Sequence, residues 1–239
     1  MSKNTALIFG FNKYASEIIS NIGKKYEHIK IFSIDEKNVS NSEYEIEHFD
    51  LSDNWSSIEN SINVDKSMAF CILEDTAKNI FLTISLRSNF ENLTIIAVAS
   101  DKESANKLSM AGANKVIPLV ETTADILTNM IQHPISNSIL HSILYEESSL
   151  KIAQIKIDDD SYFKDEKLSD IDWSIYNGII VLSVIHENLN SEFIYSSKAK
   201  RHIVKSGDIL VIVGYEADIE KFEKKIGSKR YVNWSDWSW

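Results

Sequence analysis

The chain has 239 residues, of which 44% are hydrophobic and 25% charged, a composition typical of folded globular proteins. Its 35 acidic and 25 basic residues give a formal net charge of −10, which argues against binding to nucleic-acid phosphates. No apolar stretch approaches the roughly 20 residues needed to span a bilayer, and the first residues lack the apolar core of a signal peptide. The single cysteine, Cys71, excludes an internal disulfide and a cysteine-based zinc site, and it favours a reducing compartment.

The first half of the chain alternates short apolar runs with segments of helical periodicity. The run Thr5–Phe9 ends at Gly10, helical spacing follows as far as Gly23, and a second run, Ile29–Ile34, ends at Asp35, which predicts a βαβ unit. Further strands are predicted at Tyr44–Phe49, Met68–Leu73, Leu93–Ala99 and Val116–Pro118, with helices over Trp55–Ile62, through Ile80 and Ile84, and near Leu108. This alternation predicts an α/β fold with a Rossmann-type doubly wound parallel sheet.

The second half of the chain begins with helix and then changes to strands. Helical spacing runs from Thr123, is interrupted at His133-Pro134, and resumes from Ser136 to about Tyr145, where it predicts a crossover or dimerisation helix. Strands are predicted at Leu150–Ile157, Gly178–Ile185, Glu192–Tyr195 and Ile209–Val213, followed by a helix over Glu216–Ile226. A second, smaller α+β domain is therefore expected.

These patterns predict four segments. Residues 1–134 form the Rossmann-type domain, 135–149 the crossover helix and linker, and 150–227 the α+β domain. Residues 228–239 form a tail in which Trp234, Trp237 and Trp239 cluster. Exposed tryptophans usually contact a partner surface, but folding back onto the chain is the alternative.

The turn after the first strand has part of the pattern of a dinucleotide site. Such sites need a tight turn, close backbone approach to the pyrophosphate, and a helix N-terminus that attracts the anion. Here the three glycine positions hold Gly10, Asn12 and Ala15, so a side chain stands where phosphate normally meets bare backbone. Asparagine tolerates a positive φ, so the turn can form while binding is weakened. Asp35, at the end of the second strand, is placed to accept the ribose hydroxyls and to disfavour a 2′-phosphate.

Several stretches resemble the RCK family, the TrkA-type regulators of potassium conductance. The first half resembles the family's nucleotide domain in LIFGFNKYA, FSID, HFDLSD, CILEDTAKN and KLSMAGANKVI, of which the last is the most specific. The second half resembles its ligand domain in KLSDIDW, NGIIVLSVI and VKSGDILVIVG. Together these stretches cover nearly the whole chain in the family's order.

The resemblance implies a sensor rather than a catalyst. RCK proteins form homodimers that assemble into an octameric ring beneath a potassium pore, with NAD(H) or ATP/ADP in the N-terminal domain. Carried over by position, the cofactor-binding residues are Gly10, Asn12, Lys13 and Ala15 at the phosphates, with Phe11 in the same loop, Asp35 at the ribose, Asp50 and Leu51 at the adenine, and Glu74 and Asp75 in the crevice. The expected role is that of a cytoplasmic regulatory subunit or domain of a potassium channel or transporter, held at the inner face of the plasma membrane by its channel partner and gating potassium flux in response to a bound nucleotide or other small ligand.

Two alternatives stay open at this point. A ligand-free structural assembly domain of a channel is favoured by Asn12, and an NAD-dependent oxidoreductase would share the Rossmann fold. The six histidines show no ligand-like pairing, and none accompanies a nucleophile motif; His186 is interpreted as a polar residue that ends a strand. No catalytic and no metal-binding residues are therefore predicted.

Overall fold

A computed structural model describes residues 5–23, 26, 28–36, 44–52, 55–145, 150–186, 191–196 and 199–231. The chain divides into two compact units, one ending at Thr128 and the other beginning at Asn129. The predicted domain boundary at residue 134 follows shortly after this division. Residues 146–149 of the predicted linker and residues 232–239 of the predicted tail lie outside the described part of the chain.

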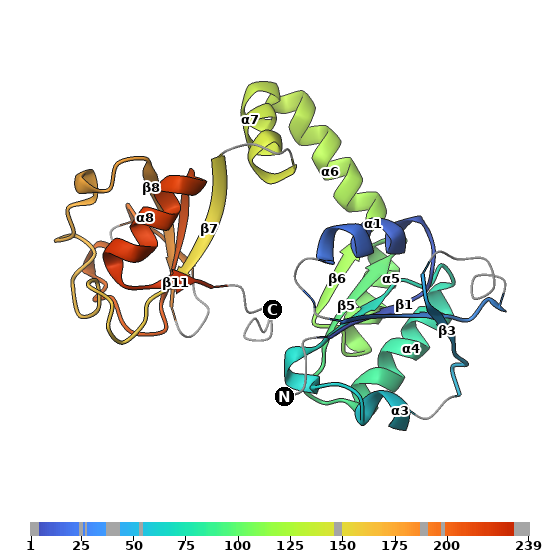
Figure 1. Ribbon diagram of the computed structural model, residues 1–239. Coiled ribbons are helices and arrows are strands. Elements are labelled where there is room, and N and C mark those ends of the chain that lie inside the picture. Colours follow the sequence, from blue (N-terminus) through green and yellow to red (C-terminus); the bar gives the residue numbers. More distant parts are fainter. Residues whose placement is uncertain are drawn as a thin grey trace. The chain divides into compact units, whose positions relative to one another are not determined.

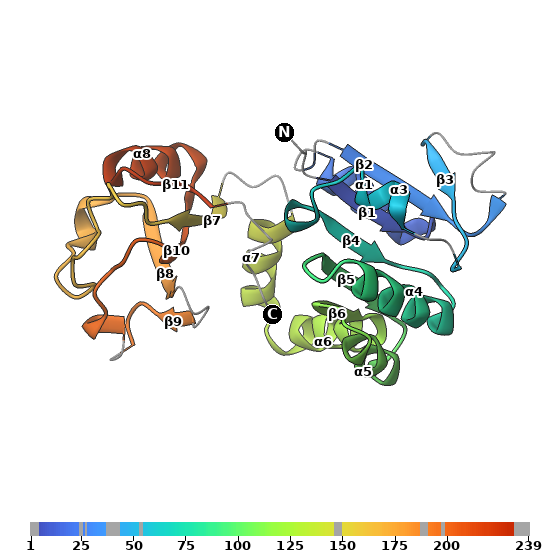
Figure 2. The same ribbon diagram turned by 90° about the horizontal axis from the view of Figure 1, so that it is seen from below.

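The first unit is a six-stranded parallel sheet with helices on both faces (Figure 1). Its elements are β1 (Thr5–Phe9), α1 (Lys13–Ile22), β2 (His28–Ser33), β3 (Ile46–His48), α3 (Ser56–Glu59), the 3-10 turn η1 (Val64–Lys66), β4 (Met68–Cys71), α4 (Thr76–Asn89), β5 (Thr94–Ala99), α5 (Lys102–Met110) and β6 (Lys115–Pro118). The strand order is β3-β2-β1-β4-β5-β6, which Figure 2 shows from below the sheet. This is the doubly wound order, so the predicted fold class is confirmed.

The alternation of side chains along β1 divides the first unit's core between the two faces of the sheet. Leu7 and Phe9 join the cluster that contains residues of α3, α4 and α5. Ala6 and Ile8 join the cluster under α1. All four side chains are fully buried, which explains why the strand has an uninterrupted apolar sequence.

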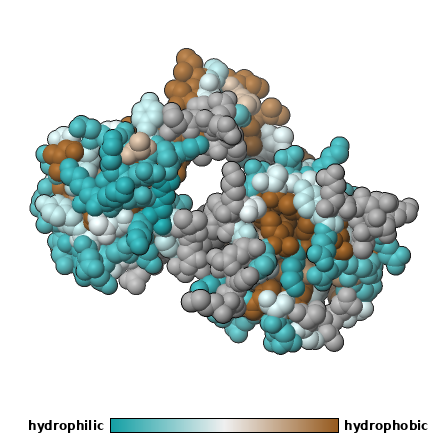
Figure 3. All heavy atoms as spheres, in the orientation of Figure 1, coloured by the Kyte–Doolittle hydropathy of each residue, from teal (hydrophilic) through white to brown (hydrophobic). Residues whose placement is uncertain are grey.

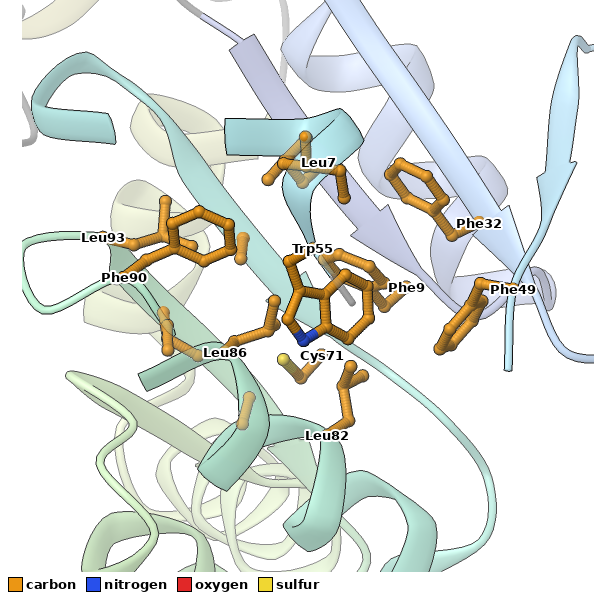
Figure 4. Close-up of a cluster of buried hydrophobic side chains, with 14 of the residues drawn as sticks. Leu7, Phe9, Phe32, Phe49, Trp55, Cys71, Leu82, Leu86, Phe90 and Leu93 are labelled. Carbon is orange, nitrogen blue, oxygen red and sulfur yellow. The ribbon is translucent and has the colours of Figure 1, made fainter. Parts of the chain in front are cut away.

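Aromatic rings fill the core on the α4 face (Figure 4). The Phe9 ring stacks on Phe32 with centroids 4.8 Å apart and meets the rings of Phe49 and Trp55 edge-on at 5.5 and 5.6 Å. The Trp55 indole N–H donates to Ser85 Oγ at 2.8 Å, so its polar atom is satisfied although the ring is buried. Cys71 lies in the same cluster.

The stretch Lys107–Ile117 most specifically resembles the RCK family. In the structure it is joined to neighbouring elements by hydrogen bonds. Gly112 adopts a φ of +101°, and a Cβ there would lie 2.6 Å from Cγ of Arg87. The Arg87 guanidinium donates to the Gly112 carbonyl at 3.0 Å and to Asn114 Oδ1 at 2.6 Å. Asn114 Oδ1 also accepts the N–H of Ile95 at 2.8 Å, so this stretch ties α4 and α5 to β5.

Two helices follow the first sheet, α6 (Leu119–Gln132) and α7 (Pro134–Tyr145). The first begins directly after Pro118, the last residue of β6, and so earlier than the predicted start at Thr123. The break falls at His133 as predicted, but α7 resumes at Pro134 and not at Ser136, because proline is accepted in the first turn of a helix. Within the described residues, no helix combines the length and the apolar character needed to cross a membrane.

The second unit contains an antiparallel sheet with strand order β11-β7-β10-β8-β9. Its elements are β7 (Leu150–Lys156), η2 (Trp173–Ile175), β8 (Ile179–Ile185), β9 (Ser191–Phe193), η3 (Ala199–Arg201), β10 (Ile209–Tyr215), α8 (Glu216–Ile226) and β11 (Lys229–Arg230). Helix α8 buries Ile219, Phe222 and Ile226 in the core of this unit. The smaller α+β domain is thus confirmed. The edge strand β11 was not predicted, because two residues are too short to show a periodic pattern in the sequence.

Candidate functional site

A cavity of about 1140 Å³ lies where three parallel strands of the first unit end. It is lined by the segments that follow β1, β2 and β4. The strand order reverses between β1 and β4, and open α/β sheets bind ligands in the crevice at such a switch point. The lining residues are Gly10, Phe11, Asn12, Lys13, Tyr14, Ser33, Ile34, Asp35, Glu36, Ile72, Leu73, Glu74, Asp75 and Lys78.

Gly10 makes the tight turn from β1 into α1. Its φ is +106°, and a Cβ would lie 2.9 Å from the carbonyl oxygen of Ile72 and 3.2 Å from the nitrogen of Leu73. Its N–H donates to the Phe32 carbonyl at 2.8 Å. Only glycine fits here, because any side chain would meet the backbone that follows β4 and would also be strained by the positive φ.

Asn12 turns its side chain toward the protein's own backbone. Oδ1 accepts the N–H of Ala15 at 3.1 Å as the N-cap of α1, and Nδ2 donates to the carbonyl of Ile72 at 3.0 Å. The expectation that Asn12 would use its tolerance of positive φ is wrong, since its φ is −144° and Gly10 has the positive value. The side chain therefore braces the loop against the end of β4, in place of the usual second glycine.

The N-terminus of α1 opens onto the cavity. Asn12 Oδ1 accepts the N–H of Ala15, and the N–H groups of Lys13 and Tyr14 belong to the same first turn. N–H groups of a first helical turn lack partners within the helix and attract anions, helped by the helix dipole. Lys13 adds a positive charge at this end, so a phosphate has both dipole and charge available.

Asp35 stands at the end of β2, across the lining from the helix. Its backbone is fixed by Ser33, whose hydroxyl accepts the Asp35 N–H at 3.1 Å and donates to the Asp35 carbonyl at 3.2 Å. Glu36 follows it, and Glu74 and Asp75 come from the segment after β4. Asp75 Oδ1 accepts the N–H of Lys78 at 2.9 Å as the N-cap of α4. Four carboxylates and two lysines thus line the cavity, and at Asp35 this lining suits ribose hydroxyls better than a 2′-phosphate.

The structure brings together seven of the ten residues carried over from the family: Gly10, Phe11, Asn12, Lys13, Asp35, Glu74 and Asp75. Ala15 is fully buried and packs α1 against the sheet. Asp50 and Leu51 follow β3 and are absent from the lining. Hydrogen bonds from the side chain and backbone of Ser52 hold the pKa of Asp50 below its usual value, so this carboxylate stabilises its own turn.

Seven lining residues were not predicted: Tyr14, Ser33, Ile34, Glu36, Ile72, Leu73 and Lys78. Most of them are neighbours of predicted residues, so the rule that ligands bind at the carboxyl ends of parallel strands could have found them. Lys78 is the exception. It is brought to the cavity by the first turn of α4.

Cys71 offers no nucleophile beside this cavity. It is fully buried at the end of β4, and burial raises the pKa of its thiol to about 12. The reactive form of a cysteine is the thiolate, which is therefore scarce at neutral pH. The cavity lining instead carries hydroxyl, carboxylate and ammonium groups and a helix N-terminus.

The fold and the cavity define a protein of the Rossmann nucleotide-binding type with a second α+β domain. Two family models match the chain, that of the TrkA-N domain over residues 6–119 and that of the TrkA-C domain over residues 152–227. Together they cover most of the sequence and coincide with the two observed sheets. The chain belongs to the RCK family.

A curated relative and solved structures extend this comparison. "Probable potassium channel protein 2" of Methanocaldococcus jannaschii is 26% identical over 164 residues, which are 66% of this chain and 46% of that protein. The chain thus spans less than half the length of this relative. The human SLO3 gating ring has a similar fold, with a TM-score of 0.62 and 9% identity over 91% of this chain and 45% of that one. The GsuK channel bound to NAD aligns with a TM-score of 0.47 and 16% identity over 94% of this chain and 38% of that one.

Proposed function

We propose that this chain is a non-enzymatic regulatory part of a potassium channel or transporter, and that a nucleotide bound in the first unit controls potassium flux through a membrane partner. Family membership and the curated relative, which is named as a potassium channel, support the transport role. In this role the chain lies in the cytoplasm, at the inner face of the plasma membrane, attached to its partner.

The observation that carries the proposal is the convergence of three features on one cavity. The glycine turn at Gly10, the N-terminus of α1 and the carboxylate of Asp35 all line it. The turn and helix suit a phosphate, and Asp35 suits the two hydroxyls of a ribose. NAD(H), ATP and ADP all carry this combination. A ligand held between these elements would favour one conformation of the chain, and a coupling of about 1–3 kcal/mol is enough to change channel opening severalfold or more.

Nucleotide binding should raise the melting temperature of the purified chain. Ligand at about 100 times its Kd stabilises a protein by about 2.7 kcal/mol, which moves the midpoint by several degrees in a chain of this size. Thermal-shift titrations with NADH, NAD, ATP and ADP measure this. Asp35→Ala should abolish or strongly reduce the shift, whereas Asp65→Ala, which removes an exposed aspartate of the same unit, should preserve it.

The charge of Asp35 supplies a second test. A 2′-phosphate would face this carboxylate, so NADPH should shift the midpoint less than NADH, and Asp35→Ala should narrow the difference. Asp50→Ala tests whether the adenine end extends beyond the cavity lining toward β3.

The absence of a shift in melting temperature with any nucleotide would favour a ligand-free assembly domain. Turnover of NADH that depends on a small substrate would instead establish an oxidoreductase.

Helices α6 and α7, which lie between the two sheets in sequence, carry exposed apolar side chains. Figure 3 shows apolar surface gathered at the top of the view, where α7 lies. The most exposed are Ile131 and Ile135, at 81% and 79%. Contiguous exposed apolar surface is typical of an interaction site. We propose that a second copy of the chain covers it, and that such dimers assemble into a ring beneath the pore.

Ile131→Asp combined with Ile135→Asp should therefore convert the dimer into a monomer. Placing two carboxylates in a desolvated interface costs far more than leaving them in water. Sedimentation at a series of concentrations measures the association. Met110→Asp is the matched control, because Met110 is 89% exposed on α5, outside this surface. A wild-type chain that stays monomeric at protein concentrations of tens of micromolar would contradict the proposed dimerisation.

A further inference from the structure

Two histidines and an aspartate meet at one end of the second sheet, outside the nucleotide cavity. His186 follows β8, His202 follows η3, and Asp208 directly precedes β10. The register of the sheet pairs Ile185 with Ile209, which places His186 and Asp208 beside each other. One ligand atom from each of the three side chains lies within 4.8 Å of the other two.

The carboxylate of Asp208 is the buried centre of this cluster. Its side chain is 3% exposed. Oδ2 accepts the N–H of Lys205 at 2.9 Å and lies 2.5 Å from Nε2 of His202. Oδ1 lies 3.7 Å from Nδ1 of His186. The two imidazole rings are close neighbours, with centroids 4.1 Å apart.

His186 has a ring nitrogen without a partner. Its Nδ1 is one of two buried side-chain polar atoms that lack a hydrogen bond in the described part of the chain. On the other side of the ring, Nε2 lies 3.8 Å from Oε1 of Glu192 on β9. A neutral imidazole has one lone pair, which here faces a carboxylate whichever nitrogen carries the proton. A cation between His186 Nδ1 and Asp208 Oδ1 would remove this mismatch.

We propose that His186, His202 and Asp208 bind a transition-metal ion of the zinc type. Two imidazoles and one carboxylate are the donors that Zn²⁺ and its first-row neighbours prefer, whereas Ca²⁺ and Mg²⁺ take oxygen ligands. Oε1 of Glu192 lies 3.8 Å from the second ring nitrogen of His186, on the side where metal-binding histidines normally have an orienting carboxylate. A fourth position is left for water or another small ligand.

The three ligand atoms lie within 4.8 Å of one another, and the two oxygens of Asp208 face different histidines, so a tetrahedral ion requires a rearrangement of these side chains. Ligand atoms about 2.0–2.1 Å from a tetrahedral Zn²⁺ are about 3.4 Å from one another. The gap of 3.7 Å between His186 and Asp208 is already close to that value. His202 and Asp208, at 2.5 Å, must separate by about 1 Å. His202 lies on the short segment between η3 and β10, and its side chain is 18% exposed, so the ring has room to move outward.

Metal titration of the full chain tests the proposal. Equilibrium dialysis against ZnCl₂ with elemental analysis should give one ion per chain, and CoCl₂ should produce the visible absorption of tetrahedral Co²⁺. Loss of an orienting carboxylate typically weakens binding about 10–100-fold, so Glu192→Gln should fall in that range and His186→Gln and His202→Gln should lose at least as much. His133→Gln, which removes an exposed histidine between α6 and α7, should bind like the wild type.

Two measurements keep the result decisive if a variant is unstable. Melting curves without metal identify any variant that has lost its fold. Imidazole ¹⁵N spectra of the wild-type chain should show Zn²⁺ shifting the signals of His186 and His202 alone. Signals that respond to pH but not to Zn²⁺ would make the cluster a proton site and overturn the proposal, as would zinc binding that both histidine variants retain.

Discussion

Replacing Phe9 by alanine is expected to lower the free energy of unfolding of the first unit by about 3–5 kcal/mol, the range for a fully buried phenylalanine. The ring contacts Phe32, Phe49 and Trp55, which come from three different segments. Phe32 lies on β2, Phe49 directly follows β3 and Trp55 directly precedes α3, so these neighbours cannot collapse completely into the space. Urea denaturation followed by tryptophan fluorescence and circular dichroism measures the loss.

The control for this prediction is Phe81→Ala. Phe81 lies on α4 and is 51% exposed, so the same truncation should cost no more than about 1 kcal/mol there. If both substitutions lowered the free energy of unfolding equally, the aromatic cluster would not be the centre of the core. The second unit should unfold at an unchanged urea concentration in both variants, because its core is separate.

Asn79→Ala should destabilise the first unit by about 3 kcal/mol, since one buried and two partly buried backbone groups each lose a partner at about 1 kcal/mol. Asn79 is 1% exposed on α4. Its Nδ2 donates to the carbonyls of Cys71 and Val98 at 3.1 and 3.0 Å, and its Oδ1 accepts the N–H of Leu73 at 3.3 Å. One side chain thus joins the ends of β4 and β5 beside the cavity. Chemical denaturation measures the stability.

This substitution should also weaken nucleotide binding, because Asn79 holds Leu73 in the cavity lining. Asn89→Ala is the matched control at the other end of α4, where the amide is exposed and donates to the Ser85 carbonyl. It should change stability by no more than about 0.5 kcal/mol. If Asn79→Ala were as mild, the three hydrogen bonds would not be what joins the strand ends.

The sequence by itself predicted the sheet of the first unit. Apolar runs such as Ala69–Cys71 record burial on both faces, and the helical spacing between them requires crossovers, which make neighbouring strands parallel. Gly10 and Asp35 could be assigned for the same reason, because each directly follows a strand whose end is readable. Such local features are encoded by residues adjacent in the chain.

Only the tertiary structure decided what the polar side chains contact. Asn12 occupied a predicted phosphate position, yet its amide reaches the carbonyl of Ile72, 60 positions away. Asn79 was part of a recognised motif, but its contact with Val98 depends on the order of β4 and β5. His186 and His202 are separated by 16 positions and a strand, with no spacing that signals a ligand pair. Hydrophobic periodicity reports burial within one element, whereas the meeting of polar groups depends on which strands pair and where loops return. For this chain, the sequence alone therefore determined the fold class and the strand ends at which the cavity lies. The folded chain decided how Asn12 contacts the end of β4 and which residues form the histidine cluster.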